Sequence, residues 1–288
     1  MIISGSPLFK QYARTALDSE NRNRRPRYTP LGIADTIVQH LLDLAKLQVT
    51  RFKISNATED SFDIFVEGRI FGTGTISSAI MSTEASLSFN GTIFGRIKLP
   101  QIQTSVWGTD FVAQEQRIEI ADYTNYCAFI RSIIVDNETS LQLYNRNCTV
   151  RALGTSSVCN LRLDMPLKAI GGPRIAVKKL SRLGSDVTIV FSLSCLGPVE
   201  VDHGFCIFEL RNGYNETLAE LKGELNIAAS QTELTLHGTT RDGAIASKRV
   251  RLVGVGVEAK EKSWLNETIR ELDVPVDLEP KCVEILWC

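Results

Sequence analysis

The sequence lacks several features that would point directly to a function. It has only three His residues, no Cys-x-x-Cys pair among its seven Cys residues, no phosphate-binding glycine loop and no Gly-x-Ser-x-Gly elbow. A zinc site, a P-loop nucleotide site and a serine hydrolase are therefore not expected. We expect neither a metal nor a cofactor.

Charge of one sign and long apolar runs are also missing. Lys and Arg total 32 against 33 for Asp and Glu, so the net charge is −1 and the basic excess of a nucleic-acid-binding protein is absent. No apolar run approaches the roughly 18 residues that a membrane-spanning helix needs. With 43% hydrophobic and 23% charged residues, the composition is that of an ordinary globular protein. We expect a folded chain that binds no nucleic acid.

Asn-x-Thr sequons, in contrast, are in excess. The chain has 13 Asn residues, and 44 of its 288 residues are Ser or Thr, so chance would give about two sequons. Six are present, at Asn56, Asn90, Asn137, Asn147, Asn215 and Asn266. The excess favours a glycoprotein of the secretory pathway over the alternative that Asn in turns and Thr in strands coincide.

The seven Cys residues fit an oxidising compartment. Two pairs are 11 positions apart, Cys148 with Cys159 and Cys195 with Cys206, a spacing that suits a cross-link between neighbouring strands. We predict a Cys195–Cys206 disulfide, because one alternating strand runs into Cys195 and the next begins at Cys206. The odd count leaves at least one free thiol, for which an inert buried Cys is favoured over a catalytic one.

The N-terminal residues do not have the pattern of a signal peptide. Residues 1–6 have neither a basic start nor an apolar core of sufficient length, so the targeting segment of a secreted protein would be absent from this sequence. Residues 10–27 contain six basic side chains against Asp18 and Glu20, which suits either the flank of a membrane anchor or a solvated tail. We expect a secretory or secreted protein and leave peripheral membrane association and the oligomeric state open.

Hydrophobic periodicity predicts a mainly β protein. Helical repeats cover about 32–47 and 123–135. Alternating apolar and polar residues predict strands, separated by turns, in eight further segments: 52–66, 80–99, 116–120, 140–170, 187–194, 205–227, 233–237 and 250–257. Asn90-Gly91 and Asn212-Gly213 are typical of tight hairpin turns, because Asn-Gly tolerates positive φ at both central positions.

The order of these elements indicates an internal duplication. The two Asn-Gly pairs lie 122 residues apart, and each is followed by a strand, a connection and a short alternating strand. We predict two tandem antiparallel β-sandwich or barrel-like modules with two or three short helices. We expect the chain to divide into a basic N-terminal segment over 1–30, a helix with the first β module over 31–153, and the second β module over 154–288.

Short motifs in a fixed order carry a family resemblance. They include Ile54-Ser-Asn-Ala-Thr58, Phe89-Asn-Gly-Thr-Ile-Phe-Gly95, Cys148-Thr-Val-Arg-Ala-Leu-Gly154, Ser263-Trp-Leu265 and Leu272-Asp-Val-Pro275. Over about residues 33–280 the chain resembles a fungal family of secretory or membrane-anchored proteins related to the type-two late-embryogenesis-abundant β-sandwich. It departs from the family pattern after Gly238, where a connection is shortened to 239–248, and it lacks the family's N-terminal membrane segment. These motifs are turns and strand ends, so they imply a fold and name no catalytic group.

One branch of that family, the fungal hetero-Diels–Alderases of tropolonic sesquiterpenoid secondary metabolism, implies a function. It would be a cofactor-independent pericyclase that couples a tropolone quinone methide with a humulene-type sesquiterpene in an apolar cavity. A cycloaddition requires positioning and a hydrogen-bond donor near the electron-poor partner, with no nucleophile or metal. The alternative is a non-enzymatic protein that binds lipids or other hydrophobic ligands, or a cell-wall protein.

The candidate cavity residues lie at strand ends and near the second predicted helix. The aromatic walls would come from Trp107, Tyr123, Tyr126 and Phe129. The alternative for each of these is packing in the core. Arg131 and His203 are the candidate catalytic hydrogen-bond donors. Trp264 and Trp287 are expected to close the structure at its C-terminal end.

Overall fold

The computed structural model describes residues 32–287, with gaps at 75, 153, 172–173, 195–196, 229–232, 242, 244, 246–248 and 259–263. Most of these residues form strands, which confirms the mainly β class. The second predicted helix is α3, with the predicted limits Tyr123–Val135. The first is shorter than predicted, because α2 spans Ile33–Asp43 and the alternating strand β1 already begins at Lys46. The predicted basic segment, 1–30, lies outside the described residues.

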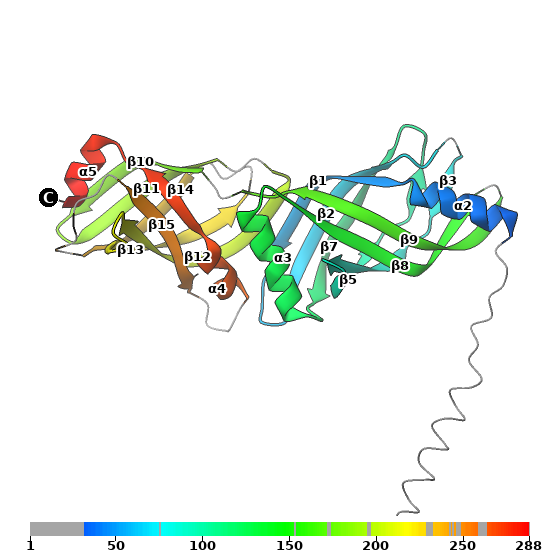
Figure 1. Cartoon of the computed structure of the whole chain (residues 1–288), viewed down its shortest axis with the longest axis horizontal. Coiled ribbons are helices and arrows are strands. Elements are labelled where there is room, and N and C mark those ends of the chain that lie inside the picture. The colour runs from blue at the N-terminus through cyan, green and yellow to red at the C-terminus, as the bar shows by residue number, and fades with distance from the viewer. Residues whose placement is uncertain are drawn as a thin grey trace, which may run out of the picture. The chain divides into compact units, whose positions relative to one another are not determined.

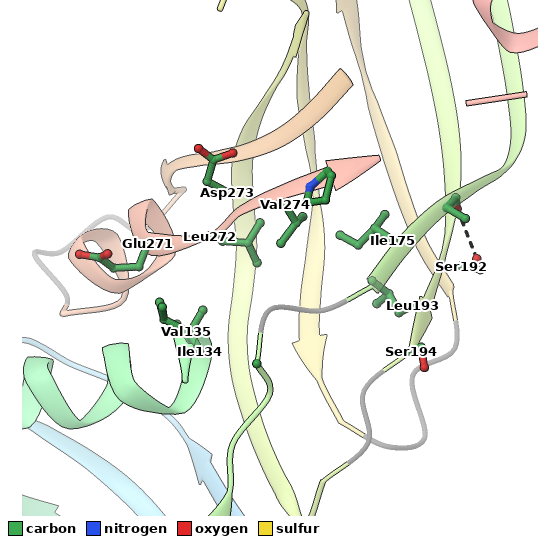
Figure 2. Close-up of a pocket in the computed structure, with 13 residues that line it drawn as sticks. Ile134, Val135, Ile175, Ser192, Leu193, Ser194, Glu271, Leu272, Asp273 and Val274 are labelled. Atoms are coloured by element: carbon green, nitrogen blue, oxygen red, sulfur yellow. Dashed lines mark hydrogen bonds between the residues drawn. The ribbon is translucent and has the colours of Figure 1, made fainter. Parts of the chain in front are cut away.

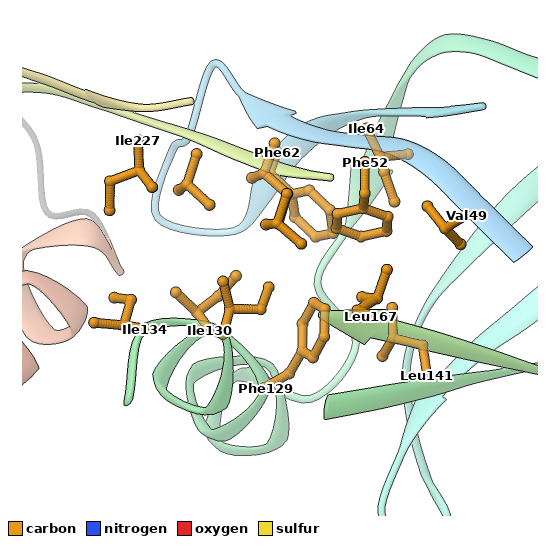
Figure 3. Packing of buried hydrophobic residues seen from close by; sticks show 14 of the residues in the cluster. Val49, Phe52, Phe62, Ile64, Phe129, Ile130, Ile134, Leu141, Leu167 and Ile227 are labelled. Carbon is orange, nitrogen blue, oxygen red and sulfur yellow. The ribbon is translucent and has the colours of Figure 1, made fainter. Parts of the chain in front are cut away.

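The first module is a sandwich of two sheets (Figure 1). One sheet contains β1 (Lys46–Ser55), β2 (Ser61–Phe71) and β7 (Thr109–Glu119). The other contains β3 (Ser78–Ile80), β4 (Thr83–Phe89), β5 (Thr92–Leu99), β6 (Ile102–Thr104), β8 (Glu138–Ala152) and β9 (Thr155–Lys168). Figure 3 shows part of the core, where Phe52 and Phe62 of one sheet meet Phe129 of α3.

The second module is a closed seven-stranded barrel. Its strands are β10 (Arg174–Leu183), β11 (Asp186–Ser194), β12 (Val199–Asn212), β13 (Thr217–Ile227), β14 (Glu233–Thr240), β15 (Val250–Val257) and β16 (Asp273–Asp277). They pair in the order β13-β14-β11-β10-β16-β15-β12, and β12 pairs with β13 to close the ring. Buried and exposed side chains alternate along most of β12 and β13, as the period of two in the sequence predicted. The two modules are therefore related in strand content but differ in architecture.

Strand β12 belongs to both modules. Its first residues, Val199–Val201, pair in parallel with Phe52–Ile54 of β1, and the rest of the strand pairs with β13 and β15 in the barrel. The short β16 also pairs in parallel with β10. The other strand pairs of the described residues are antiparallel, as predicted. These two are parallel, because a strand that returns through a long connection can enter the sheet in either direction.

The boundary between the modules lies later than predicted. Strand β9 pairs with β8 from Glu138–Lys168 at one end to Ala152–Thr155 at the other, so it completes a sheet of the first module. The predicted boundary at 153/154 is the turn of this long hairpin, where Gly154 has a φ of 76°. Two short helical segments, α4 (Leu265–Thr268) and η1 (Ile269–Glu271), lie between the barrel strands β15 and β16, and α5 (Pro280–Trp287) follows β16. In the described part of the chain, no helix combines the length and apolar character that crossing a membrane requires.

Helix α3 covers an open edge of the first-module core. Asp122 caps its N-terminus, because the Oδ1 atom accepts a hydrogen bond of 2.9 Å from the backbone N–H of Asn125. Its buried face contains Tyr126, Phe129 and Ile130, which fall at helical spacing in the sequence. The helix ends at Val135, next to the barrel, and so carries residues of the first module to the module junction.

The two Asn-Gly pairs form different turns. Asn90 and Gly91 have φ values of 49° and 82° between the paired residues Phe89 and Thr92, as the sequence predicted for a two-residue hairpin. At the second pair, the residue with positive φ is Asn215 (66°). The buried side chain of Asn212 organises this longer turn, because its Oδ1 accepts hydrogen bonds from the backbone N–H groups of Tyr214 (2.9 Å) and Glu216 (2.8 Å).

We expect Asn212→Ala to destabilise the fold by about 1–3 kcal/mol, because two partly buried backbone N–H groups would lose their acceptor. The amide Nδ2 also donates to Glu216 Oε2 (2.8 Å) and Ile245 O (2.9 Å), and these contacts would be lost as well. Denaturant unfolding measures the change. Gly213→Ala is the control and should have a small effect; a larger loss for Gly213→Ala than for Asn212→Ala would contradict this account of the turn.

Candidate functional site

A cavity of about 570 Å³ lies where α3 meets the barrel (Figure 2). Four segments that are far apart in the sequence line it: the end of α3, the start of β10, the end of β11, and the run from η1 into β16. The lining residues are Ile134, Val135, Gly171, Ile175, Ala176, Ser192, Leu193, Ser194, Glu271, Leu272, Asp273, Val274 and Pro275. Its volume is within the range of cavities that hold small organic ligands.

The inner wall of this junction cavity is aliphatic. Figure 2 shows Ile175, Leu193, Leu272 and Val274 directed into one space, with Ile134 of α3 on its lower side. All five side chains are buried. They come from strand and helix ends, so they form an apolar surface only after both modules have folded. Such a wall favours an apolar ligand, because contact with the ligand removes further apolar surface from water.

The polar groups of the junction cavity are largely paired with one another. Arg131 Nε donates to Glu271 Oε2 at 3.0 Å, and Arg251 Nη1 donates to Asp273 Oδ2 at 2.6 Å. Ser192 Oγ donates to the backbone carbonyl of Ala176 at 3.3 Å, the interaction drawn in Figure 2. Because each carboxylate has a cationic partner, the wall has little uncompensated charge. Within the lining, the hydroxyl groups of Ser192 and Ser194 are the side-chain hydrogen-bond donors.

Arg131 is the one predicted catalytic residue next to the junction cavity. It lies on α3 and contacts the cavity wall through Glu271. Its side chain is mostly exposed, and the cavity lining does not include it. The structure therefore places Arg131 at the rim, where it fixes the position of a wall residue.

His203, the other predicted donor, lies elsewhere. It is 1% exposed and lines a smaller cavity of about 280 Å³ with Asp202 and Phe205 of β12 and with Leu265 of α4. Burial lowers its pKa to about 4, although the Val201 backbone and the Asp202 carboxylate act in the opposite direction. The imidazole is therefore neutral near pH 7 and does not serve the junction cavity.

The four predicted aromatic wall residues do not meet around a cavity. Tyr126 stacks on Phe62 with ring centroids 4.4 Å apart, and Phe129 stacks on Phe94 at 5.6 Å, so both belong to the core. Trp107 is 86% exposed, and Tyr123 lies at the surface of α3. The wall prediction is wrong because the aromatic face of α3 packs on the sandwich.

The closing role expected for Trp264 agrees with its position. Trp264 is fully buried, and its ring lies edge-on to Tyr126 at 5.0 Å. The contact joins the connection between the barrel strands β15 and β16 to α3 of the first module. The side chain of Trp287 lies outside the described part of the structure.

Sequence reasoning missed the aliphatic wall residues. In the sequence, Leu272-Asp-Val-Pro275 indicates only a strand end, although this segment provides one wall of the junction cavity. Val187 to Ser194 was recognised as a strand, but nothing in its alternation marks Ser192–Ser194 as a cavity end. Aliphatic residues at strand ends carry no chemical signature, so only the folded arrangement reveals them.

Cys195 lies outside the described residues, so the predicted Cys195–Cys206 disulfide stays a prediction. Cys206 is buried, has a free thiol in the structure and is paired in register with Gly223 and Val257. Its Sγ faces the backbone carbonyls of His203 and Gly204, each at 3.6 Å.

The sequon residues occupy two kinds of position. Five of the six are exposed: Asn56, Asn90, Asn137, Asn147 and Asn215. Asn266 is half-buried in α4, and its Oδ1 accepts a hydrogen bond of 3.3 Å from the backbone N–H of Val257. A glycan fits the five exposed positions but would disrupt the packing of Asn266.

Comparisons with known proteins give no family assignment. No protein-family model matches the chain, and no curated protein matches it significantly. Among solved structures, CBD12 from CALX1.2 has 10% identity and a TM-score of 0.20 over 81% of this chain and 100% of its own. The calcium binding domain CBD12 of CALX1.1 also has 10% identity and a TM-score of 0.20, over 81% and 96%. A beta-glucuronidase from glycoside hydrolase family 2 has 9% identity and a TM-score of 0.18, over 74% and 25%. Similarities at this level support no argument about function.

For glycosylation, we expect protein made in a eukaryotic secretory host to carry glycan at several of the five exposed sequons and none at Asn266. Mass mapping of peptides before and after endoglycosidase treatment measures the occupancy of each site. We expect this difference in occupancy because a glycan needs solvent around its attachment point, and Asn266 is half-buried. A mass that endoglycosidase leaves unchanged would remove the glycoprotein prediction.

For His203, we expect the free energy of unfolding to fall as the pH is lowered from about 6.5 to about 4. In this range the unfolded chain binds a proton that the folded protein excludes, so protonation favours unfolding. The pKa difference corresponds to as much as about 3 kcal/mol. Denaturant unfolding at several pH values should show this slope in the wild type and a smaller one in His203→Leu. His237→Gln, at an exposed position, should keep the slope. A wild-type slope retained in His203→Leu would contradict the assignment.

Proposed function

We propose that the protein binds an apolar small molecule in the junction cavity. The observation that carries this proposal is the convergence of five buried aliphatic side chains from both modules on a cavity of about 570 Å³. Burial of apolar ligand surface contributes roughly 25 cal/mol per Å², so a ligand of modest size gains several kcal/mol there. The paired carboxylates at the rim add little charge that would oppose an apolar ligand.

The reaction proposed for this cavity is a hetero-Diels–Alder coupling of a tropolone quinone methide with a humulene-type sesquiterpene. The family resemblance motivates the reaction, and the cavity supplies what its mechanism needs. Both partners are largely apolar, and holding them in contact provides effective molarities worth about 7–11 kcal/mol. Ser192, whose side chain lines the cavity, is the donor that we propose would turn from the Ala176 carbonyl to a tropolone oxygen, and Arg131 would hold Glu271 in place at the rim.

A ligand-binding protein without turnover would use the same cavity. The two functions differ in what happens after binding, because a carrier would leave the rate and the product ratio of the spontaneous coupling unchanged. The decisive assay compares active and heat-denatured protein at equal substrate concentrations. A higher rate or an altered stereochemical ratio supports the pericyclase, whereas binding with identical rates and ratios supports the carrier.

The cavity itself can be tested with Ala176→Phe, which adds a ring at a lining position on β10. We expect an apolar fluorescent probe or an alkene substrate to bind at least tenfold more weakly, because the added side chain occupies the ligand volume. Val190→Phe is the matched control, since Val190 lies two residues before Ser192 on β11 but outside the cavity lining. Titration of both variants against the wild type measures the effect. Equal affinity of Ala176→Phe and the wild type would exclude this cavity as the binding site.

A further inference from the structure

Cys148 and Cys159 face each other directly across the β8–β9 hairpin. They are register partners in the antiparallel ladder, followed by the pair Thr149–Val158. Both thiols are buried, at 0% and 3% exposure, whereas Val158 on the opposite face is 59% exposed. The two Cys side chains therefore project from the same face of the sheet toward the core.

This arrangement meets the geometric requirement for a disulfide. Directly opposed residues of an antiparallel pair have Cα atoms about 4.5–5.5 Å apart, and disulfides span Cα separations of about 4.4–6.8 Å. We propose that Cys148 and Cys159 form a cross-strand disulfide when the chain folds in an oxidising compartment. The structure shows the reduced form, in which both thiols are free.

The state of the two thiols in the folded protein indicates when the bond forms. Burial and, to a smaller extent, the neighbouring Cys159 raise the pKa of Cys148 to about 11. Because the thiolate is the attacking species, a buried protonated pair reacts slowly. Oxidation therefore belongs to folding, after β8 and β9 have paired and before the core closes over them.

The reaction requires an external oxidant, which is a disulfide of a thiol oxidoreductase or of oxidised glutathione. One Cys thiolate attacks the oxidant's disulfide to form a mixed disulfide, and the second displaces the oxidant's remaining thiol. The two Cys residues lose two protons and two electrons in total, and the oxidant is reduced to two thiols.

The surrounding structure gives this cross-link a mechanical role. The β8–β9 register shifts between Asn145 and Cys148, so the ladder is interrupted next to the pair. Beyond Cys159, the side chain of Gln39 on α2 holds the backbone of Asn160: Gln39 Nε2 donates to Asn160 O at 2.9 Å, and Asn160 N donates to Gln39 Oε1 at 2.8 Å. Among the strands that the structure describes, β9 pairs only with β8. A disulfide would therefore fasten an edge strand at the point where its ladder is irregular.

The other described cysteines do not compete for this bond. Cys127 lies on α3, where its Sγ is 3.8 Å from Glu267 Oε2. Cys206 faces backbone carbonyls inside the barrel. Among the cysteines that the structure describes, Cys148 and Cys159 alone are register partners.

Peptide mapping tests the proposal directly, because Arg151 separates the two residues. The full chain is made in a secretory eukaryotic host, alkylated without reduction, deglycosylated and digested with trypsin. Cleavage after Arg146, Arg151 and Arg162 gives the peptides 147–151 and 152–162. We expect them to run as one species whose mass is two hydrogens below the sum, and to separate on reduction. Two separate peptides, each alkylated at its Cys, would overturn the proposal.

A stability measurement tests the mechanical role. We expect reductant to lower the thermal midpoint of the wild type by several degrees more than that of Cys148→Ala/Cys159→Ala, because the variant has no such bond to lose. Cys127→Ala is the control and should respond to reductant like the wild type. An equal shift in the wild type and the double variant would show that the pair adds no constraint on unfolding.

Discussion

The architecture depends on one strand that serves two modules. β12 begins as a neighbour of β1 in the sandwich and continues as a wall of the barrel, so neither module is complete without it. Its direction changes at an irregularity between Asp202 and Gly204, where the register with β13 shifts. Gly204 has a φ of 62° there, and its N–H donates to Asp202 Oδ1 at 3.0 Å. A side chain at Gly204 would be strained in this conformation, and an irregularity of this kind is how sheets bend.

The burial of His203 follows from this bend. The residue between Asp202 and Gly204 is turned inward where the two modules meet, and its ring nitrogens make no well-formed hydrogen bond with the described residues. An unsatisfied buried polar group costs about 1–3 kcal/mol. The strand geometry that joins the modules thus carries a local destabilisation, which the surrounding apolar packing offsets. The bend in β12 is therefore enough to explain why His203 is buried, without a catalytic role.

The junction cavity is a second consequence of the shared strand. Because β12 holds the barrel against the sandwich, α3 comes to lie beside α4 and η1, where Tyr126 meets Trp264 and Arg131 pairs with Glu271. These contacts close one side of the junction, and the cavity is the space that remains between α3 and β10, β11 and β16. Its shape is therefore set by the placement of whole elements. A change at Arg131 would act on the cavity through the position of Glu271 as well as through any direct contact with a ligand.

The sequence was informative where structure follows from local periodicity and uninformative where it follows from long-range placement. The period of two predicted the strands, and the helical spacing of the apolar residues predicted α3 with the correct limits. The tight hairpin predicted at Asn212-Gly213 was wrong, because Asn-Gly can also occur in a longer turn, in which the Asn side chain accepts hydrogen bonds from the backbone.

The prediction of the cavity residues was wrong for a different reason. Aromatic residues are obvious candidates for cavity walls, yet Tyr126 and Phe129 of α3 pack in the core. The cavity is lined instead by aliphatic residues that come from segments up to 140 positions apart. A site that works by enclosing its ligands needs shape more than reactive groups, so its residues are ordinary in type and are recognised only by where the fold places them.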